Sequence, residues 1–373
     1  MVSTPVNAVA TAAHSSEPFR TDIQVLRGFA ILLVLLHHGR LLPWLKAGHL
    51  GVDVFFVVSG YLITRVIQRA LKDGTFSFTE FYLRRAKRLL PAAYSTFAVT
   101  VLLSNLFLTE PEMWDFAWQM LGAVTFTGNI ALWMQTGYFE GAAQLKPLLH
   151  VWSLSIEEQY YLLLPAALMF TPPRFWKLGI LAMVAGSLLL CFALLSSKPG
   201  AVFYLLPTRA WELGLGSLGV LVWEGSVAGT WLARLFWPAL AALLLVPFFP
   251  TGAPHPGLDA LIVCTATLVI LLRRHPLLNQ GWAARGPAHL GDISYSLYLV
   301  HWPLLAFSAN AWVSPVPGWV RAGLVVVSIF LSWGLYRWVE DPIRRLPFQA
   351  TKKIICATLA ASLGLVLAAF IFA

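Results

Sequence analysis

Charged residues are scarce in this 373-residue sequence. Asp, Glu, Lys and Arg together make up 12% of it, whereas hydrophobic residues make up 58%. Soluble globular domains carry about 25% charged residues, so this composition excludes an ordinary soluble domain. Sixteen Trp and 24 Phe are typical of a protein with much lipid-facing and interfacial surface. The composition therefore predicts an all-α polytopic membrane protein.

Cysteine is also scarce. The three cysteines, Cys191, Cys264 and Cys356, lie inside apolar segments. Their number and spacing exclude a disulfide framework and a cysteine-based metal site, so we interpret them as packing residues and expect no metal cofactor.

The N-terminus lacks the apolar core of a cleaved signal peptide. Residues 1–20 are rich in Ala, Ser and Thr, which predicts a disordered cytoplasmic tail. The net charge of +9 does not indicate nucleic-acid binding, because the basic residues fall in short connectors between apolar runs. We therefore expect no nucleic-acid partner.

Apolar stretches long enough to cross a bilayer recur along the chain. Ten of them cover residues 24–43, 50–68, 89–109, 151–170, 178–196, 204–223, 232–250, 257–272, 291–310 and 319–338, and an eleventh covers 354–372. We predict a membrane domain of about ten transmembrane helices over residues 21–347. Residues 354–373 are predicted to form an additional C-terminal transmembrane helix.

Basic residues set the predicted orientation. The connector 69–88 holds six Lys and Arg residues, which places it and the N-terminus in the cytoplasm. Residues 114–134 are apolar but interrupted by Gly, Thr and Asn. If this stretch is re-entrant rather than spanning, residues 135–150 lie outside and eight later basic residues lie inside. These eight are Arg273, Arg274, Arg285, Arg337, Arg344, Arg345, Lys352 and Lys353. We prefer that reading. No internal repeat is evident, which weakens a transporter built on inverted repeats.

The first predicted span carries a charge at one end and an imidazole at the other. Arg27 and His38 are eleven positions apart, about three helical turns, so they share one face roughly 16 Å apart. His37 points about a quarter-turn away. Ionisable groups inside a membrane helix are functional candidates by default. The alternative is that Arg27 only snorkels to the interface while His38 bonds a neighbouring helix.

Further ionisable residues are predicted at similar depths. Glu157 and Glu158 enter the membrane from outside, as do Arg209 and Glu212, whereas His301 enters from inside. These groups can meet His38, whose ordinary pKa near neutrality suits a general base for a hydroxyl. Two alternatives stay open at this point: either glutamate can simply pair with Arg209, and His301 can be a packed residue at a proline kink.

Three arginines of the basic connector suit a phosphate-rich ligand. Arg84, Arg85 and Arg88 can form forked, bidentate hydrogen bonds to phosphate. The alternative is that the basic connector is only a topology signal.

Six blocks, in this order, resemble the acyltransferase-3 family of membrane O-acyltransferases. They are Leu26-Arg-Gly28 through His38, Gly51–Thr64 (GVDVFFVVSGYLIT), Phe81–Pro91 (FYLRRAKRLLP), His150–Gln159 (HVWSLSIEEQ), Ile293–Pro303 (ISYSLYLVHWP) and Val339–Arg344 (VEDPIR). The resemblance covers about residues 21–347.

The resemblance implies transfer of an acyl group, usually acetyl, from cytoplasmic acyl-CoA to a carbohydrate hydroxyl at the outer face. It implies that His38 is the catalytic histidine, that Arg85 and Arg88 hold the CoA phosphates, and that Glu157 and Glu158 form the acidic block. We add His301 to the catalytic residues. We expect Arg27 to orient the donor's pantetheine or pyrophosphate, and we include Arg84 among the donor-binding residues. Asp53, Ser155, Arg209 and Glu212 are our candidates for acceptor binding.

The expected partners are the lipid bilayer, acetyl-CoA as donor co-substrate and a surface glycan such as lipopolysaccharide O-antigen or exopolysaccharide. Many relatives continue into an extracytoplasmic SGNH-type domain, whereas this sequence stops at Ala373. We expect that domain as a C-terminal or separate partner, and the bacterial inner membrane as the location. Two rival functions stay open: a transporter of an acyl or sugar substrate without chemistry, and a non-enzymatic subunit of a polysaccharide assembly machine.

Overall fold

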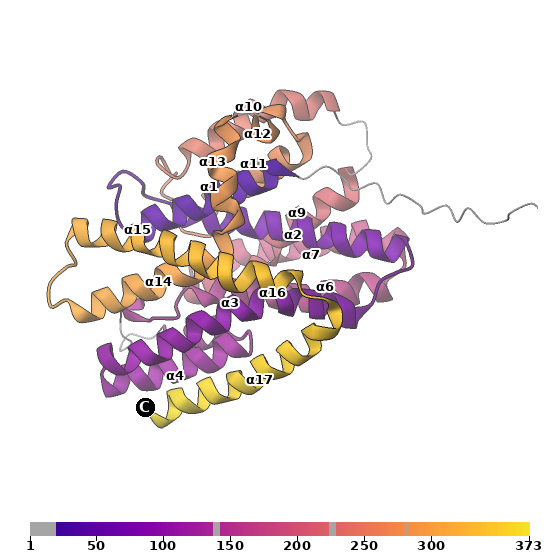
Figure 1. The fold of residues 1–373 in the computed structure, drawn as a ribbon. Coiled ribbons are helices and arrows are strands. Elements are labelled where there is room, and N and C mark those ends of the chain that lie inside the picture. Colours follow the sequence, from indigo (N-terminus) through magenta and orange to yellow (C-terminus); the bar gives the residue numbers. More distant parts are fainter. Residues whose placement is uncertain (1–19, 137–141, 224–228, 281) are drawn as a thin grey trace, which may run out of the picture.

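The computed structural model describes residues 20–136, 142–223, 229–280 and 282–373, and the regular secondary structure of these residues is helical, with no β-strand among them (Figure 1). The prediction of an all-α fold is confirmed. The predicted tail, residues 1–20, lies outside the described residues apart from Arg20.

Among the described residues, five helical segments are long and apolar enough to cross a membrane. They are α1 (Thr21–His38), α2 (Leu50–Lys72), α3 (Phe78–Phe107), α7 (Pro173–Leu194) and the segment Gly318–Arg345, which joins α15 (Gly318–Leu335), the π-helix η2 (Tyr336–Glu340) and α16 (Asp341–Arg345). Other predicted spans correspond to α6 (Val151–Phe170), α9 (Leu206–Trp223), α10 (Gly229–Leu245), α11 (Leu258–Arg273), α14 (Ser294–Ala311) and α17 (Phe348–Ile371). Several apolar helices are thus confirmed, while the count of ten plus one stays a prediction.

The connector 69–88 is mostly helical rather than a loop. α2 continues to Lys72, and α3 begins at Phe78, eleven residues before the predicted span. The Ser77 side chain accepts a hydrogen bond from the Glu80 amide and thereby caps α3. Hydropathy missed this extension because it is rich in arginine. Its arginines are consequently held on a helix, where their directions are fixed.

The stretch 114–134 forms two helices that fold back on each other. α4 (Glu110–Val124) is followed after three residues by α5 (Gly128–Met134). The Gln119 side-chain amide donates to Gln135 Oε1 over 3.1 Å, so the chain returns toward the level at which α4 passed. That this hairpin does not cross the membrane stays a prediction.

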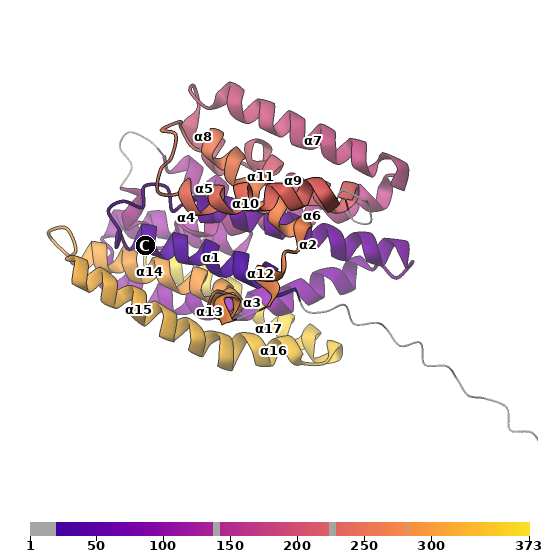
Figure 2. The same cartoon turned by 90° about the horizontal axis from the view of Figure 1, so that it is seen from above.

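The helices that carry the candidate site lie in the middle of the molecule. In Figure 2, α1 and α2 lie between a layer that contains α7 and α10 and a layer that contains α15 and α16. α2 packs so closely on α9 that a Cβ on Gly60 would collide with the backbone carbonyl of Leu213. α1 packs on α13 (Trp282–Asp292), which follows the short α12 (Pro276–Asn279) and which hydropathy did not predict. The short α8 (Pro199–Tyr204) precedes α9.

Candidate active site

Two histidines from distant parts of the chain are hydrogen-bonded where α1 ends. His38 Nδ1 lies 3.0 Å from His301 Nε2, and the two rings are nearly parallel at 4°. On the other side of its ring, His301 Nδ1 lies 2.9 Å from the Leu297 carbonyl oxygen, one turn earlier in α14. The Trp302 ring packs edge-on against His38 with centroids 4.6 Å apart, and its indole donates to the Lys146 carbonyl. The predicted meeting of His38 with His301 is therefore present.

The hydrogen-bond partners of His38 and His301 determine which ring nitrogens carry a hydrogen. A carbonyl oxygen only accepts, so the hydrogen on neutral His301 belongs on Nδ1, facing Leu297. His301 Nε2 then accepts, and the hydrogen on His38 belongs on Nδ1. This leaves His38 Nε2 with a free lone pair. His38 is half-buried whereas His301 is buried, so His38 is the ring that a substrate can reach.

A tyrosine lies beside the pair. The Tyr298 ring centroid is 5.6 Å from His301 and 5.6 Å from His150. The Tyr298 hydroxyl donates to the His150 carbonyl over 2.8 Å. Since that hydroxyl has one hydrogen, Ser153 Oγ is the donor in the 2.6 Å bond between Ser153 and Tyr298. Both hydroxyls are buried and satisfied.

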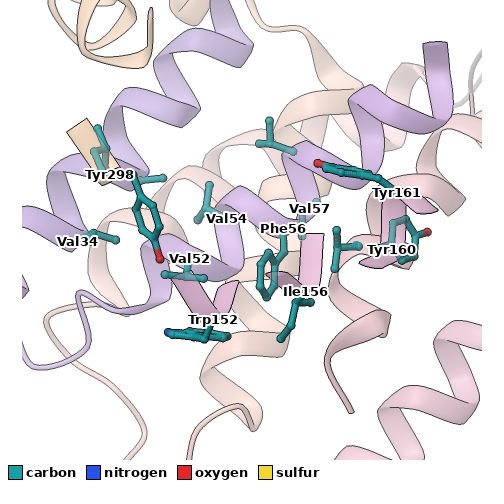
Figure 3. Packing of buried hydrophobic residues seen from close by; sticks show 14 of the residues in the cluster. Val34, Val52, Val54, Phe56, Val57, Trp152, Ile156, Tyr160, Tyr161 and Tyr298 are labelled. Carbon is teal, nitrogen blue, oxygen red and sulfur yellow. The ribbon is translucent and has the colours of Figure 1, made fainter. Parts of the chain in front are cut away.

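A cavity of about 170 Å³ lies between α1, α2, α3, α6 and α14. Its polar lining residues are Arg27, Ser59, Arg85, Arg88, Ser153, Glu157, Tyr161, Ser294, Tyr295 and Tyr298. Along α2 the lining runs from Val52 to Val66, 14 positions or about 21 Å. Arg27, Arg85 and Arg88 are thus gathered around one elongated cavity. Figure 3 shows Tyr298, Val52 and Tyr161 among the buried side chains of this region.

Arg85 is held by an ion pair and by an aromatic ring. Its guanidinium pairs with the Glu158 carboxylate at 2.5 Å and lies over the Tyr161 ring, 3.7 Å from the centroid. Glu158 therefore positions Arg85 and does not pair with Arg209. Glu157, one residue earlier, faces the cavity and accepts hydrogen bonds from Ser59 Oγ and the Tyr161 hydroxyl at 3.1 and 3.3 Å.

Arg84 and Ser155, both predicted site residues, lie away from this cavity. Arg84 is 66% exposed and pairs with Glu80 one turn earlier. Ser155 is buried, accepts from the Gly128 amide and donates to the Val151 carbonyl, so it helps to dock α5 against α6. Neither residue lines the cavity in the described structure.

The predictions gave no role to one buried carboxylate near the arginines. Glu340 is 2% exposed, lies in the π-helix η2 and accepts a 2.7 Å hydrogen bond from Ser296 Oγ. The π-helix η2 packs against α3, the helix that carries Arg88. The sequence signal was available, since Glu340 belongs to the block Val339–Arg344 and follows an apolar run.

The remaining predicted residues form a separate buried cluster. Arg209 Nη2 lies 3.2 Å from Asp53 Oδ1, and its Nε lies 3.0 Å from Glu212 Oε1 without the alignment of a hydrogen bond. All three side chains are 0% exposed. Arg209 Nη1 also contacts His255 Nε2 at 3.0 Å. The expectation that Arg209 joins the glutamates of α6 beside His38 is therefore not met: Arg209 pairs with Asp53 and Glu212.

Two histidines outside the helices connect this cluster to the end of α1. The ring centroids of His255 and His49 are 4.5 Å apart, and those of His49 and His37 are 5.3 Å apart. Burial lowers the pKa of His49 to about 4 and, with the charge of Arg209, holds the pKa of His255 well below its ordinary value. Both rings are therefore neutral near pH 7.

The same cluster brings together atoms that can ligate metals. Oxygen or sulfur atoms of Asp53, Glu212 and Cys264 lie within 4.8 Å of one another. The Arg209 guanidinium already contacts both carboxylates, however, and supplies positive charge where a cation would have to bind. We assign no metal to these residues.

The sequence of the chain, compared with known proteins, shows the family to which it belongs. Residues 20–337, well over half of the chain, match the family described as an acyltransferase domain. The chain therefore belongs to the acyltransferase-3 family, which confirms the resemblance, and membership supports an O-acyltransferase activity in a multi-pass membrane protein.

Three relatives illustrate the match. The chain is 30% identical over 352 residues to the membrane-bound transacylase BcsY of Komagataeibacter xylinus, covering 93% of this chain and 89% of BcsY. It is 29% identical over 347 residues to the O-acetyltransferase OatA of Staphylococcus aureus, covering 87% of this chain and 57% of OatA. With YrhL of Bacillus subtilis, named as a peptidoglycan O-acetyltransferase, it shares 31% identity over 349 residues, covering 87% and 55%. The chain thus spans a little over half of the length of OatA and YrhL, and no solved structure matches it.

Proposed function

We propose that this protein transfers an acyl group, specifically acetyl, from cytoplasmic acyl-CoA to a hydroxyl of an extracytoplasmic cell-surface glycan. The observation that carries the proposal is the arrangement of one cavity and one histidine pair. Three arginines line the cavity, and an imidazole pair with one free lone pair lies just beyond the tyrosine at its end. The names of OatA and YrhL as O-acetyltransferases support acetyl as the group and a glycan as the acceptor.

The cationic part of the cavity is the proposed donor site. Arg27, Arg85 and Arg88 would bind the phosphates of CoA, for which the forked guanidinium is suited. Glu158 and the Tyr161 ring fix Arg85 in direction before the donor arrives, which reduces the entropy lost on binding. Arg84 is exposed on the same helix and would contribute to attracting the anionic donor rather than to holding it.

His38 is the proposed general base. Its Nε2 takes the proton of the acceptor hydroxyl as the hydroxyl oxygen bonds to the thioester carbonyl carbon. The C–S bond then breaks, and the proton passes from His38 to the thiolate, so that CoA leaves as the thiol. His301 holds the required tautomer of His38 and stabilises its protonated form through the Nδ1–H···Nε2 bond.

The carboxylates take supporting roles in this proposal. Glu157 faces the cavity on the path between the arginines and Tyr298, whereas Glu158 acts through Arg85. Asp53, Arg209 and Glu212 are fully enclosed, so we propose that they position the beginning of α2, and with it the acceptor side, rather than touch the glycan. The role of Ser155 is the docking of the hairpin of α4 and α5.

We also propose the orientation that this reaction needs. The N-terminus and residues 339–353 lie in the cytoplasm of a bacterial inner membrane, residues 135–150 lie outside, and 354–372 carries the chain outward. The basic residues of α3 support the cytoplasmic placement of that end. An SGNH-type domain, linked or separate, is the proposed partner on the outer side.

The proposal is tested by chemistry in the purified protein. Acetyl-CoA labelled in its acetyl group is supplied with a glycan acceptor, and both free CoA thiol and O-acetyl signals in the glycan are measured by NMR. The proposal predicts equal amounts of both products. Movement of the substrate across a vesicle membrane with the thioester intact would favour a transporter.

A further inference from the structure

The donor cavity and the catalytic base are separated in this structure. Val52, Ser153 and Tyr298 line the outer end of the cavity, whereas neither His38 nor His301 is among its described lining residues. His301 follows Tyr298 by three positions in α14, about 4.5 Å further along the helix. The Tyr298 ring, in contact with both sides, lies between them.

Tyr298 contacts both the cavity lining and the histidine pair. On the cavity side its ring packs edge-on against Phe55, with centroids 6.4 Å apart. On the other side its ring lies 5.6 Å from His301. Figure 3 shows the hydroxyl end of Tyr298 directed toward Val52, another lining residue of the cavity.

Two hydrogen bonds hold the ring in this place. The hydroxyl donates to the His150 carbonyl and accepts from Ser153 Oγ, at 2.8 and 2.6 Å. Both partners belong to the beginning of α6 and its N-cap, so the bonds join α6 to α14 across the end of the cavity. Rotation of the Tyr298 side chain about χ1 to another staggered rotamer would break both hydrogen bonds and move the ring as a unit.

We propose that Tyr298 is a movable partition between the donor cavity and the His38–His301 pair. It must swing aside for the thioester to meet His38, and it otherwise keeps the acceptor side, with its water, away from the bound thioester. This proposal rests on the donor site and the base assigned above. Tyr298 acts on access and takes no part in bond making, so it is a positioning residue.

The test is the labelling of a cysteine at position 38 from each face of the membrane. His38→Cys is made on a background without Cys191, Cys264 and Cys356 and is treated with a membrane-impermeant methanethiosulfonate in right-side-out and inside-out vesicles. With Tyr298 present, labelling from the outer face is expected to be at least tenfold faster than labelling from the cytoplasmic face. Tyr298→Ala is expected to raise the cytoplasmic-face rate at least tenfold.

A matched control removes an aromatic ring elsewhere. Phe97 is 3% exposed in α3 and does not line the cavity. Phe97→Ala is expected to leave the cytoplasmic-face rate unchanged, and unchanged outer-face labelling shows that each variant is folded. If Tyr298→Ala does not fold, Tyr298→Phe, which keeps the ring but loses both hydrogen bonds, is expected to give a severalfold increase. An unchanged rate in the folded Tyr298 variants, or an equal increase in Phe97→Ala, would overturn the partition.

Adding CoA to the cytoplasmic face separates this proposal from the proposed function. CoA is expected to slow the labelling of Tyr298→Ala because it fills the cavity. If Tyr298→Ala raises the rate but CoA does not lower it, the partition stands and the donor assignment fails. If CoA binding is measured but Tyr298→Ala has no effect on labelling, the donor site stands and the partition is wrong.

Discussion

A single backbone carbonyl determines how the histidine pair is protonated. Leu297 O faces His301 Nδ1, which makes His301 Nε2 an acceptor and orients the lone pair of His38 Nε2 away from the pair. The sequence showed His38 and His301 as intramembrane ionisable residues, but which nitrogen bonds which depends on the packing of α1 against α14. Residue types and spacing carry no information on that point.

The tautomer predicts different outcomes for two substitutions of His301. Gln retains an oxygen that can accept from His38 Nδ1–H, whereas Ala leaves that hydrogen without a partner. We expect His301→Ala to lower kcat at least tenfold and His301→Gln to retain more of it, with the KM for the donor unchanged in both. Steady-state kinetics of CoA release check this. Equal kcat values for Ala and Gln would contradict the assigned tautomer.

The arginines of the cavity give a prediction on donor affinity. Arg88→Ala should weaken acyl-CoA binding by about 1.5–3 kcal/mol, roughly 10- to 150-fold in Kd, since it removes charge-assisted hydrogen bonds. Arg88→Lys should restore only part of the affinity because it lacks the planar fork. The control is Arg84→Ala, on the same helix but exposed and outside the cavity, which should bind the donor almost as wild type does.

Calorimetry on the purified protein measures these affinities. Arg85→Ala leaves the Glu158 carboxylate unpaired, so it is compared with the double variant Arg85→Ala/Glu158→Gln. A Kd for acyl-CoA that is equal in wild type and Arg88→Ala would mean that the arginines only set the membrane topology.

In individual helices, hydropathy was most accurate where the helix is apolar on average, even when it carries a few polar residues. α6 has the predicted bounds, 151–170, and α9, α11 and α14 differ from prediction by at most three residues at either end. Hydropathy missed the first turns of α3, where arginines interrupt the apolar pattern, and it missed α13, which contains Arg285 and His289. Arg85 and Arg88 lie in the missed turns of α3, and α13 packs against α1, so hydropathy left out part of the proposed donor site and of its support.

The packing of α2 on α9 gives a prediction on stability. A Cβ at Gly60 would collide with the Leu213 carbonyl, whereas a Cβ at Gly179 in α7 has no atom within 4 Å. We expect Gly60→Ala to destabilise the protein by about 1–3 kcal/mol because a backbone must shift. Gly179→Ala should be neutral or slightly stabilising. Thermal unfolding of both variants in the same detergent tests this, and equal melting temperatures would contradict the close approach.

In the whole molecule, the proposed topology requires that the hairpin of α4 and α5 does not cross the membrane. The bond between Gln119 and Gln135 shows the chain returning, but the side on which it returns is part of the proposal. Cysteines at Gln144 and Lys353, both exposed, report on the two sides. On a background without native cysteines, an impermeant thiol reagent added to intact cells should label Gln144→Cys and spare Lys353→Cys. The reverse pattern would mean that residues 110–134 cross once.

In the proposed reaction, His38 is the general base and the donor is bound in the arginine-lined cavity. The most direct measurement compares purified wild type, His38→Ala and His37→Ala for acetyl transfer and for acyl-CoA binding. His37 is the matched control because it precedes His38 in α1 and its ring packs against His49 instead of His301. We predict that His38→Ala lowers transfer by about 10²–10⁴-fold with an unchanged donor Kd, and that His37→Ala retains most of its activity. Full transfer in His38→Ala, or an equal loss in both variants, would contradict the account.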